Sequence, residues 1–188
     1  MAEWLGVGLQ TQIRWFESAL NLQHINTMNR LFKKINSDRV NVVKHTLDIL
    51  KENPNVRIHV GCDSQNIGKK RFKTKQTAYA TVIAYHYEGS KGVHYILSME
   101  HVSPMLPDKS WEKLWGEVER SIEVAQWLKT NIPSIEVQID LDFNSDEEEW
   151  SNKLVNASSG YITALGFKAN VKPFMQIATH AADHHVRK

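Results

Sequence analysis

Apolar residues recur at helical spacing in the first fifty residues of the chain. Within residues 1–36, apolar residues lie three or four positions apart at Ile13, Phe16 and Leu20, and again at Met28, Leu31 and Phe32. This spacing predicts amphipathic helices. A clearer helix is predicted to begin at Ser37 or Asp38 as N-cap and to end at Asn53-Pro54, because proline stops a helix. We therefore expect residues 1–52 to form an N-terminal helical extension.

The pattern then changes to the period of two that is typical of strands. Strands are predicted at residues 56–63, 77–87 and 92–102, where β-branched and aromatic residues alternate with polar ones. The turn sequence Glu88-Gly89-Ser90-Lys91-Gly92 joins the last two in a hairpin. Three consecutive strands of this kind are expected to form an antiparallel meander.

Helices and strands alternate in the remainder of the chain. A helix capped by Asp108 or Ser110 is predicted to run to about Thr130, followed by a strand from Ile135. A helix from Ser145 or Asp146 to Leu165, a strand at 167–171 and a final helix at 175–187 complete the pattern. We predict an α/β domain over residues 53–188, with a mixed sheet of five strands flanked by helices.

Composition narrows the class of protein. A chain of 188 residues with 41% apolar content is long enough for one domain with a sizeable core. Its net charge of +2 is too small to identify a nucleic-acid-binding protein by itself. The single cysteine, Cys62, forms no internal disulfide, and the sequence has neither a long apolar run nor the basic start of a secretory signal. We expect a cytoplasmic protein with no membrane segment.

Four acidic residues are candidates for one shared site. Asp63 ends the apolar strand that begins at Arg57, and a strand cannot bury a carboxylate cheaply without a partner. The others are Glu119 on the long helix, Asp140 in the fourth strand and Asp183 near the C-terminus. A divalent cation is the simplest common partner for such acids.

Two further acids are close alternatives. At about 100° per residue, Glu119 falls at the edge of the apolar face of its helix, whereas Glu117 falls on the far flank. Asp142 competes with Asp140, because alternate residues of a strand point to the same face. The acidic run at 146–149 is interpreted as structural, since acids in the first turn complement the helix dipole.

The blocks that contain these acids resemble a known family. They are Val-Gly-Cys-Asp-Ser-Gln at 60–65, Glu-Arg-Ser-Ile at 119–122, Gln-Ile-Asp at 138–140, the run from Leu165 to Pro173, and Ala-Asp-His-His at 182–185. In order and spacing they resemble the bacterial YkuK-type family of predicted ribonuclease H-like nucleases. The resemblance covers roughly residues 56–188. It implies a ribonuclease H-like fold and a metal-dependent nuclease.

The expected chemistry is hydrolysis of phosphodiester bonds with two Mg²⁺ or Mn²⁺ ions, which a cluster of anionic oxygen ligands would hold. Asp63 is expected to bridge the ions, with Glu119 and Asp140 on one and Asp183 on the other. His184 or His185 is a candidate for proton transfer. The substrate class is RNA, an RNA–DNA hybrid or structured DNA, and the pattern does not choose among them.

Other interpretations remain open. Each acid could be an ordinary turn, cap or surface residue, which would leave a non-catalytic nucleic-acid-binding or scaffolding domain. His180 and His184 lie one helical turn apart and could bind zinc in a hydrolase, although the glutamate of the metalloprotease motif is missing.

Two segments are predicted to make intermolecular contacts. A basic loop between the first two strands is a candidate for binding nucleic acid, with cations for phosphates and one aromatic ring for a base. Its residues are Lys69, Lys70, Arg71, Phe72, Lys73 and Lys75. The aromatic residues of the N-terminal helices are expected to pack on the core or to join two copies of the chain in a homodimer.

Overall fold

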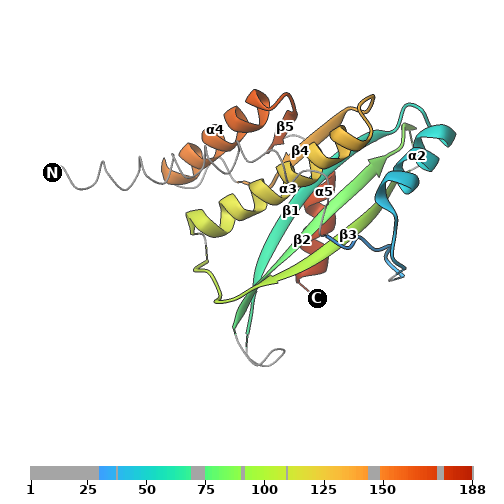
Figure 1. Ribbon diagram of the computed structural model, residues 1–188. Helices are drawn as coiled ribbons and strands as arrows, with labels where there is room; N and C mark the ends of the chain where they lie inside the picture. Colours follow the sequence, from blue (N-terminus) through green and yellow to red (C-terminus); the bar gives the residue numbers. More distant parts are fainter. Residues whose placement is uncertain are drawn as a thin grey trace.

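The chain forms an α/β fold in which helices cover both faces of a single sheet (Figure 1). A computed structural model describes residues 30–36, 38–68, 75–89, 92–108, 110–143, 149–172 and 176–187. The described elements, in chain order, are α2 (Val42–Glu52), β1 (Arg57–Ile67), β2 (Gln76–His86), β3 (Val93–Val102), α3 (Trp111–Asn131), β4 (Val137–Leu141), α4 (Glu149–Ala164), β5 (Lys168–Val171) and α5 (Ile177–Val186). The helices predicted within residues 1–29 lie outside the described residues.

The sheet has five strands in the order β3-β2-β1-β4-β5. β1, β2 and β3 form an antiparallel meander, whereas β4 and β5 are parallel to β1. This arrangement confirms the predicted fold class. Pairing between β1 and β4 ends at Gly61 and Asp140, so Asp63 and Asp142 lie just beyond the point where the two strands stop pairing.

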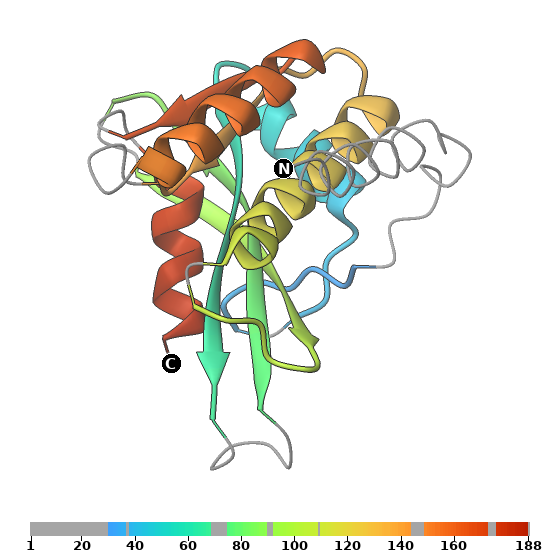
Figure 2. The same cartoon turned by 90° about the vertical axis from the view of Figure 1, so that its left-hand side faces the viewer.

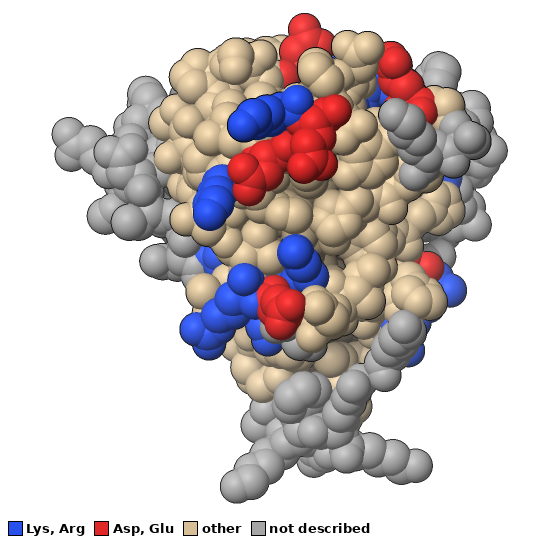
Figure 3. All heavy atoms as spheres, turned by 90° about the vertical axis from the view of Figure 1, so that its right-hand side faces the viewer, with Lys and Arg blue, Asp and Glu red and all other residues tan. Residues whose placement is uncertain are grey.

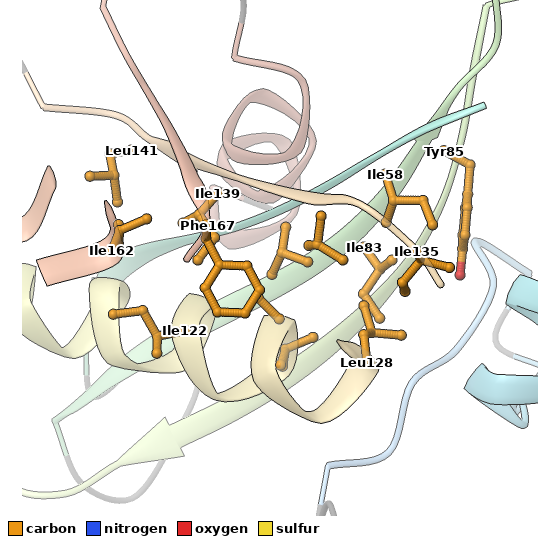
Figure 4. Packing of buried hydrophobic residues seen from close by; sticks show 14 of the residues in the cluster. Ile58, Ile83, Tyr85, Ile122, Leu128, Ile135, Ile139, Leu141, Ile162 and Phe167 are labelled. Carbon is orange, nitrogen blue, oxygen red and sulfur yellow. The ribbon is translucent and has the colours of Figure 1, made fainter. Parts of the chain in front are cut away.

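Helices α3 and α4 lie on one face of the sheet and α5 lies on the other (Figure 2). The larger hydrophobic core lies between the sheet and α3 and α4, where Ile58, Ile83 and Ile139 pack with Ile122 and Leu128 (Figure 4). Nearly every residue of β2 is buried, as expected for a strand that is covered on both faces.

Small residues line the contact between α5 and the sheet. Ala80 and Ala84 of β2 pack against Ala178 and Ala182 of α5. Because alanine side chains are short, the helix backbone lies close to the strands. This close packing becomes important for the position of Asp183.

The segment before β1 belongs to the folded core. Phe32 is 1% exposed and joins the same core cluster as α2. Helix α2 begins at Val42, where Asn41 caps it by accepting a hydrogen bond from Lys44 N at 3.1 Å. The prediction of a cap at Ser37 or Asp38 was therefore wrong.

The segment around Phe32 is also not helical. Lys33 forms an isolated antiparallel bridge with Leu97 of β3, and its N–H donates to the Leu97 carbonyl at 2.9 Å. The helical spacing of Met28, Leu31 and Phe32 was therefore misleading over the described part of this segment. Pairing with the edge strand β3 satisfies the backbone of Lys33 instead.

Candidate active site

Asp63 lies within β1, just beyond the point where β1 stops pairing with β4, and its carboxylate meets acidic residues from other elements. The strand continues to Ile67, so the prediction that it ends at Asp63 was wrong. Burial raises the pKa of Asp63 to about 6, a hydrogen bond from the Ser64 backbone opposes the rise, and the charges of Asp183 and Asp142 add to it. The side chains of Asp63 and Asp183 also share a hydrogen bond, which favours a proton between them. Asp63 is therefore an acid that holds its proton more tightly than usual.

Glu117 joins this group from α3. Its residue is only 6% exposed. Burial raises the pKa of Glu117 well above its usual range, and the charges of Asp63 and Asp142 raise it further. The Ser64 hydroxyl donates a hydrogen bond to Glu117 Oε1 at 2.5 Å. A residue of β1 next to Asp63 therefore holds the Glu117 carboxylate beside that strand.

Asp142 and Asp183 complete the group and are more accessible. Their side chains are 26% and 28% exposed. Asp142 follows the last residue of β4 and forms an ion pair with Lys172. Asp183 forms an ion pair with Arg187 one turn further along α5. Both cations partly offset the negative charge of the site.

The donor set fits hard divalent cations. Asp63, Glu117, Asp142 and Asp183 supply carboxylate oxygens from β1, α3, the end of β4 and α5, and Mg²⁺ and Mn²⁺ prefer such ligands. Their mutual repulsion raises the pKa values of Asp63 and Glu117, and a bound cation would relieve that repulsion. In the described ranges, no three His, Cys, Asp or Glu side chains already converge at metal-binding distance.

Asp140, the predicted ligand in the fourth strand, has a different environment. It is completely buried, and its carboxylate accepts four hydrogen bonds. Two of the donors are the Ile177 and Ala178 backbone N–H groups at the start of α5, at 2.8 and 2.9 Å. Both oxygens of Asp140 are thus used within the protein.

Glu119, the predicted ligand on the long helix, lies among other neighbours. Burial raises the pKa of Glu119, Arg120 lowers it, and Glu123 raises it again. Its charge also raises the pKa of Tyr161 of α4. The structure groups Glu117 with Asp63, whereas it places Glu119 beside α4.

The sequence contains a signal for Glu117 that simple apolar periodicity misses. The buried face of α3 includes Val124 and Leu128 and continues towards the N-terminus through Ser121, Glu117 and Lys113 at four-residue steps. A helix whose buried stripe turns from apolar to polar at one end indicates a polar site at that end.

Cys62 and the histidines of α5 do not join the group of carboxylates around Asp63. Burial raises the pKa of the Cys62 thiol, which makes it a small buried hydrophobe as expected. His180 and His184 are exposed, and His185 Nε2 lies 2.9 Å from the Tyr95 hydroxyl. Among the described residues, no group of three metal-binding side chains includes these histidines.

Most of the predicted basic loop lies outside the described residues. This applies to Lys69, Lys70, Arg71, Phe72 and Lys73, whereas Lys75 is described and exposed at the start of β2. On the face shown in Figure 3, acidic and basic side chains of the described residues lie in small neighbouring groups.

The chain matches a known protein family. A family model described as ribonuclease H-like matches residues 40–187, which is well over half of the chain. No curated protein matches the chain. No helix among the described residues is both long and apolar enough to cross a bilayer.

Proposed function

We propose a nuclease function from one premise: the chain belongs to the ribonuclease H-like family. Membership suggests a nuclease-like or nucleic-acid-related function. The observation that carries the proposal is Asp63, which lies on the central strand just beyond its pairing with β4 and is coupled to acids from three other elements. Clustered carboxylates at the ends of strands are suited to hydrolysing phosphodiester bonds.

The proposed metal ligands are Asp63, Glu117, Asp142 and Asp183. Asp63 and Asp183 are retained from the sequence prediction, while Glu117 and Asp142 replace Glu119 and Asp140. The replacement rests on the charge coupling of Glu117 and Asp142 to Asp63 and on the four hydrogen bonds already made by Asp140. Bound Mg²⁺ or Mn²⁺ would activate a water and stabilise the departing oxygen.

Neighbouring polar residues orient the proposed metal ligands. Ser64 orients Glu117 through its hydroxyl, and Lys172 and Arg187 hold the two accessible acids, Asp142 and Asp183. Because Asp63 keeps its proton more tightly than usual, cation binding and proton release at this carboxyl are coupled. Activity should therefore rise as the pH increases through the pKa of Asp63.

Nucleic acid is the proposed substrate, as RNA, hybrid or structured DNA. The basic loop at residues 69–75 is proposed to contact phosphates, with exposed Lys75 at its end. The resemblance to the YkuK-type family stays a prediction at this finer level. It does not narrow the substrate further.

The test compares two glutamates on one helix. Purified Asp63→Asn, Glu117→Gln and Glu119→Gln proteins are assayed on labelled RNA, hybrid and DNA with Mg²⁺ or Mn²⁺. Asp63→Asn and Glu117→Gln each remove an anionic ligand without changing size, so cleavage should fall by several orders of magnitude. Glu119→Gln is the matched control and should stay within a few fold of the wild type.

Three results would contradict the proposal. Cleavage that survives Asp63→Asn would exclude the carboxylate site. Cleavage that needs zinc and disappears in His180→Ala would favour a zinc hydrolase. Tight binding of nucleic acid by a wild-type protein that cleaves none of the three substrates would favour a non-catalytic binding domain.

A further inference from the structure

A completely buried carboxylate on β4 caps a helix from a different part of the chain. Oδ2 of Asp140 accepts hydrogen bonds from the backbone N–H groups of Ile177 and Ala178, the first two residues of α5. The N-cap residue of α5, Gln176, makes no capping hydrogen bond with its side chain. Asp140 therefore satisfies two of the four N–H groups that a helix leaves unpaired at its start.

The other oxygen of Asp140 is held by two side chains. Oδ1 accepts a hydrogen bond from Asn170 Nδ2 at 2.8 Å and lies 3.0 Å from His59 Nδ1, which donates to it. The side chain of His59 is 5% exposed. With four donors around it, this carboxylate has a fixed orientation and no free oxygen for a cation.

A glycine next to Asp140 brings the same helix turn close to β1. Gly61 pairs with Asp140 in the register of β1 and β4. A Cβ atom at Gly61 would lie 2.9 Å from both the backbone N and the Cγ2 of Thr179. The first turn of α5 is thus held at two neighbouring strand positions, by hydrogen bonds at one and by the absence of a side chain at the other.

The proposed metal ligands lie one step further along the same three elements. Two residues along β1 lead from Gly61 to Asp63, and two along β4 lead from Asp140 to Asp142. One turn along α5 leads from Thr179 to Asp183. These steps are similar in length, because two strand residues advance about 6.6 Å and four helix residues advance about 6 Å. Helix α5 and β1 also run in the same direction (Figure 2).

We propose that His59, Asp140 and Gly61 form a clamp that sets the position of α5 on the sheet and so places Asp183 against Asp63. These three are positioning residues. Their effect on catalysis rests on the proposed function, whereas their effect on α5 does not. The sequence prediction assigned Asp140 to metal binding. The clamp gives it a positioning role instead.

The experiment separates the geometry of Asp140 from its charge. Asp140→Ala removes the cap, whereas Asp140→Asn keeps one oxygen for the two backbone N–H groups of α5. Glu136→Ala, an exposed acid just before β4, is the matched control. Amide hydrogen exchange is measured by NMR in metal-free protein, and Mn²⁺ affinity and the kcat and KM of cleavage are measured separately.

We expect exchange of the Ile177 and Ala178 amides to accelerate at least about tenfold in Asp140→Ala, because these groups lose their acceptor. Mn²⁺ affinity and kcat should fall about 10–100-fold with KM little changed, as when a group that orients ligands is removed. Asp140→Asn should restore the slow exchange of these two amides, because its one oxygen can still accept from them. Should Asp140→Ala fail to fold, His59→Leu and His59→Asn provide the same comparison, because asparagine keeps a donor near the position of Nδ1.

The clamp is overturned if Asp140→Ala and Asp140→Asn both lose activity while amide exchange at Ile177 and Ala178 stays at the wild-type rate even in Asp140→Ala. That result would make Asp140 a ligand through its charge. If the wild type neither binds Mn²⁺ nor cleaves nucleic acid, the proposed function fails, but the exchange rates still test the clamp. Unchanged exchange in both members of a folded variant pair refutes it.

Discussion

Asp63 is the residue where burial and charge repulsion meet, and its protonation should govern the stability of the metal-free protein. Its pKa in the folded protein is about 6, against an ordinary value of 3.8. The unfolded chain therefore releases this proton at lower pH than the folded protein does. Stability is then lost as the pH rises from about 4 to about 6.

The corresponding prediction concerns the melting temperature in EDTA. The wild type should lose stability across this pH window, and Asp63→Asn should lose less, because asparagine has no proton to release. The exposed variant Glu136→Gln is the control and should follow the wild type. Mg²⁺ should restore stability above pH 6 in the wild type and in Glu136→Gln but not in Asp63→Asn, since cations bind the folded site. Parallel melting curves for Asp63→Asn and the wild type would contradict this account.

At the scale of single residues, the sequence predicts which segments contribute acids better than it predicts which acid of each segment. Strand alternation places Asp140 and Asp142 on one face, but it does not show that the start of α5, 37 residues after Asp140, uses Asp140 as its cap. The helical wheel likewise misjudges Glu117, whose place is set by the hydroxyl of Ser64 on β1. Both choices depend on tertiary contacts.

The contact between α5 and β1 is the element pair that the site depends on most. Gly61→Ala should introduce a Cβ only 2.9 Å from the backbone N of Thr179. Because a backbone atom cannot rotate away, α5 must shift, at a cost of about 1–3 kcal/mol in the free energy of unfolding. Urea denaturation measures this cost.

A second glycine near the end of the same strand provides the control. Nothing lies within 4 Å of a Cβ placed at Gly68, so Gly68→Ala should leave stability and cleavage close to the wild type. Gly61→Ala should also weaken Mn²⁺ binding, because Asp183 moves with α5. A Gly61→Ala protein with unchanged stability and Mn²⁺ affinity would show that the close approach has no functional consequence.

Elements with a clear period were predicted well, and elements defined by distant pairing were not. The strand period indicated β1, β2 and β3 and the hairpin between the last two. The start of α2 was misplaced because the preceding segment pairs with the edge of the sheet through Lys33 and Leu97. A local pattern of apolar residues carries no information about that pairing.

At the scale of the whole molecule, the order of strands and acids was enough to predict the ribonuclease H-like family and the mixed sheet. Each strand run is short, but only a few topologies accommodate a meander followed by alternating helices and strands. The predicted boundary between an N-terminal extension and the domain, after residue 52, does not follow the packing of the core. The family model begins at residue 40, and Phe32 belongs to the core. We propose that the folded unit includes residues 30–52.

Two truncations test that boundary. Removing residues 1–29 leaves Arg30, whose guanidinium forms ion pairs with Glu100 and Glu123 at 2.6 Å each, and leaves Phe32, which is 1% exposed. Removing residues 1–36 deletes both residues and the bridge from Lys33 to Leu97. The longer truncation should be severely less stable than the shorter one, because only the shorter one keeps the contacts of residues 30–36. Light scattering on both proteins also tests the predicted homodimer.

A pair of point variants in the full chain separates the contribution of Phe32 from chain length. Phe32→Ala should lower the free energy of unfolding by about 3–5 kcal/mol, as expected for a large buried side chain replaced by a small one. Leu31→Ala is the matched control, because Leu31, next to Phe32 in the chain, is 59% exposed and contributes little burial. Urea denaturation curves decide the question. Equal stability of the two variants, or of the two truncations, would place residues 30–36 outside the folded unit, which would return the boundary to the helical extension that the sequence predicts.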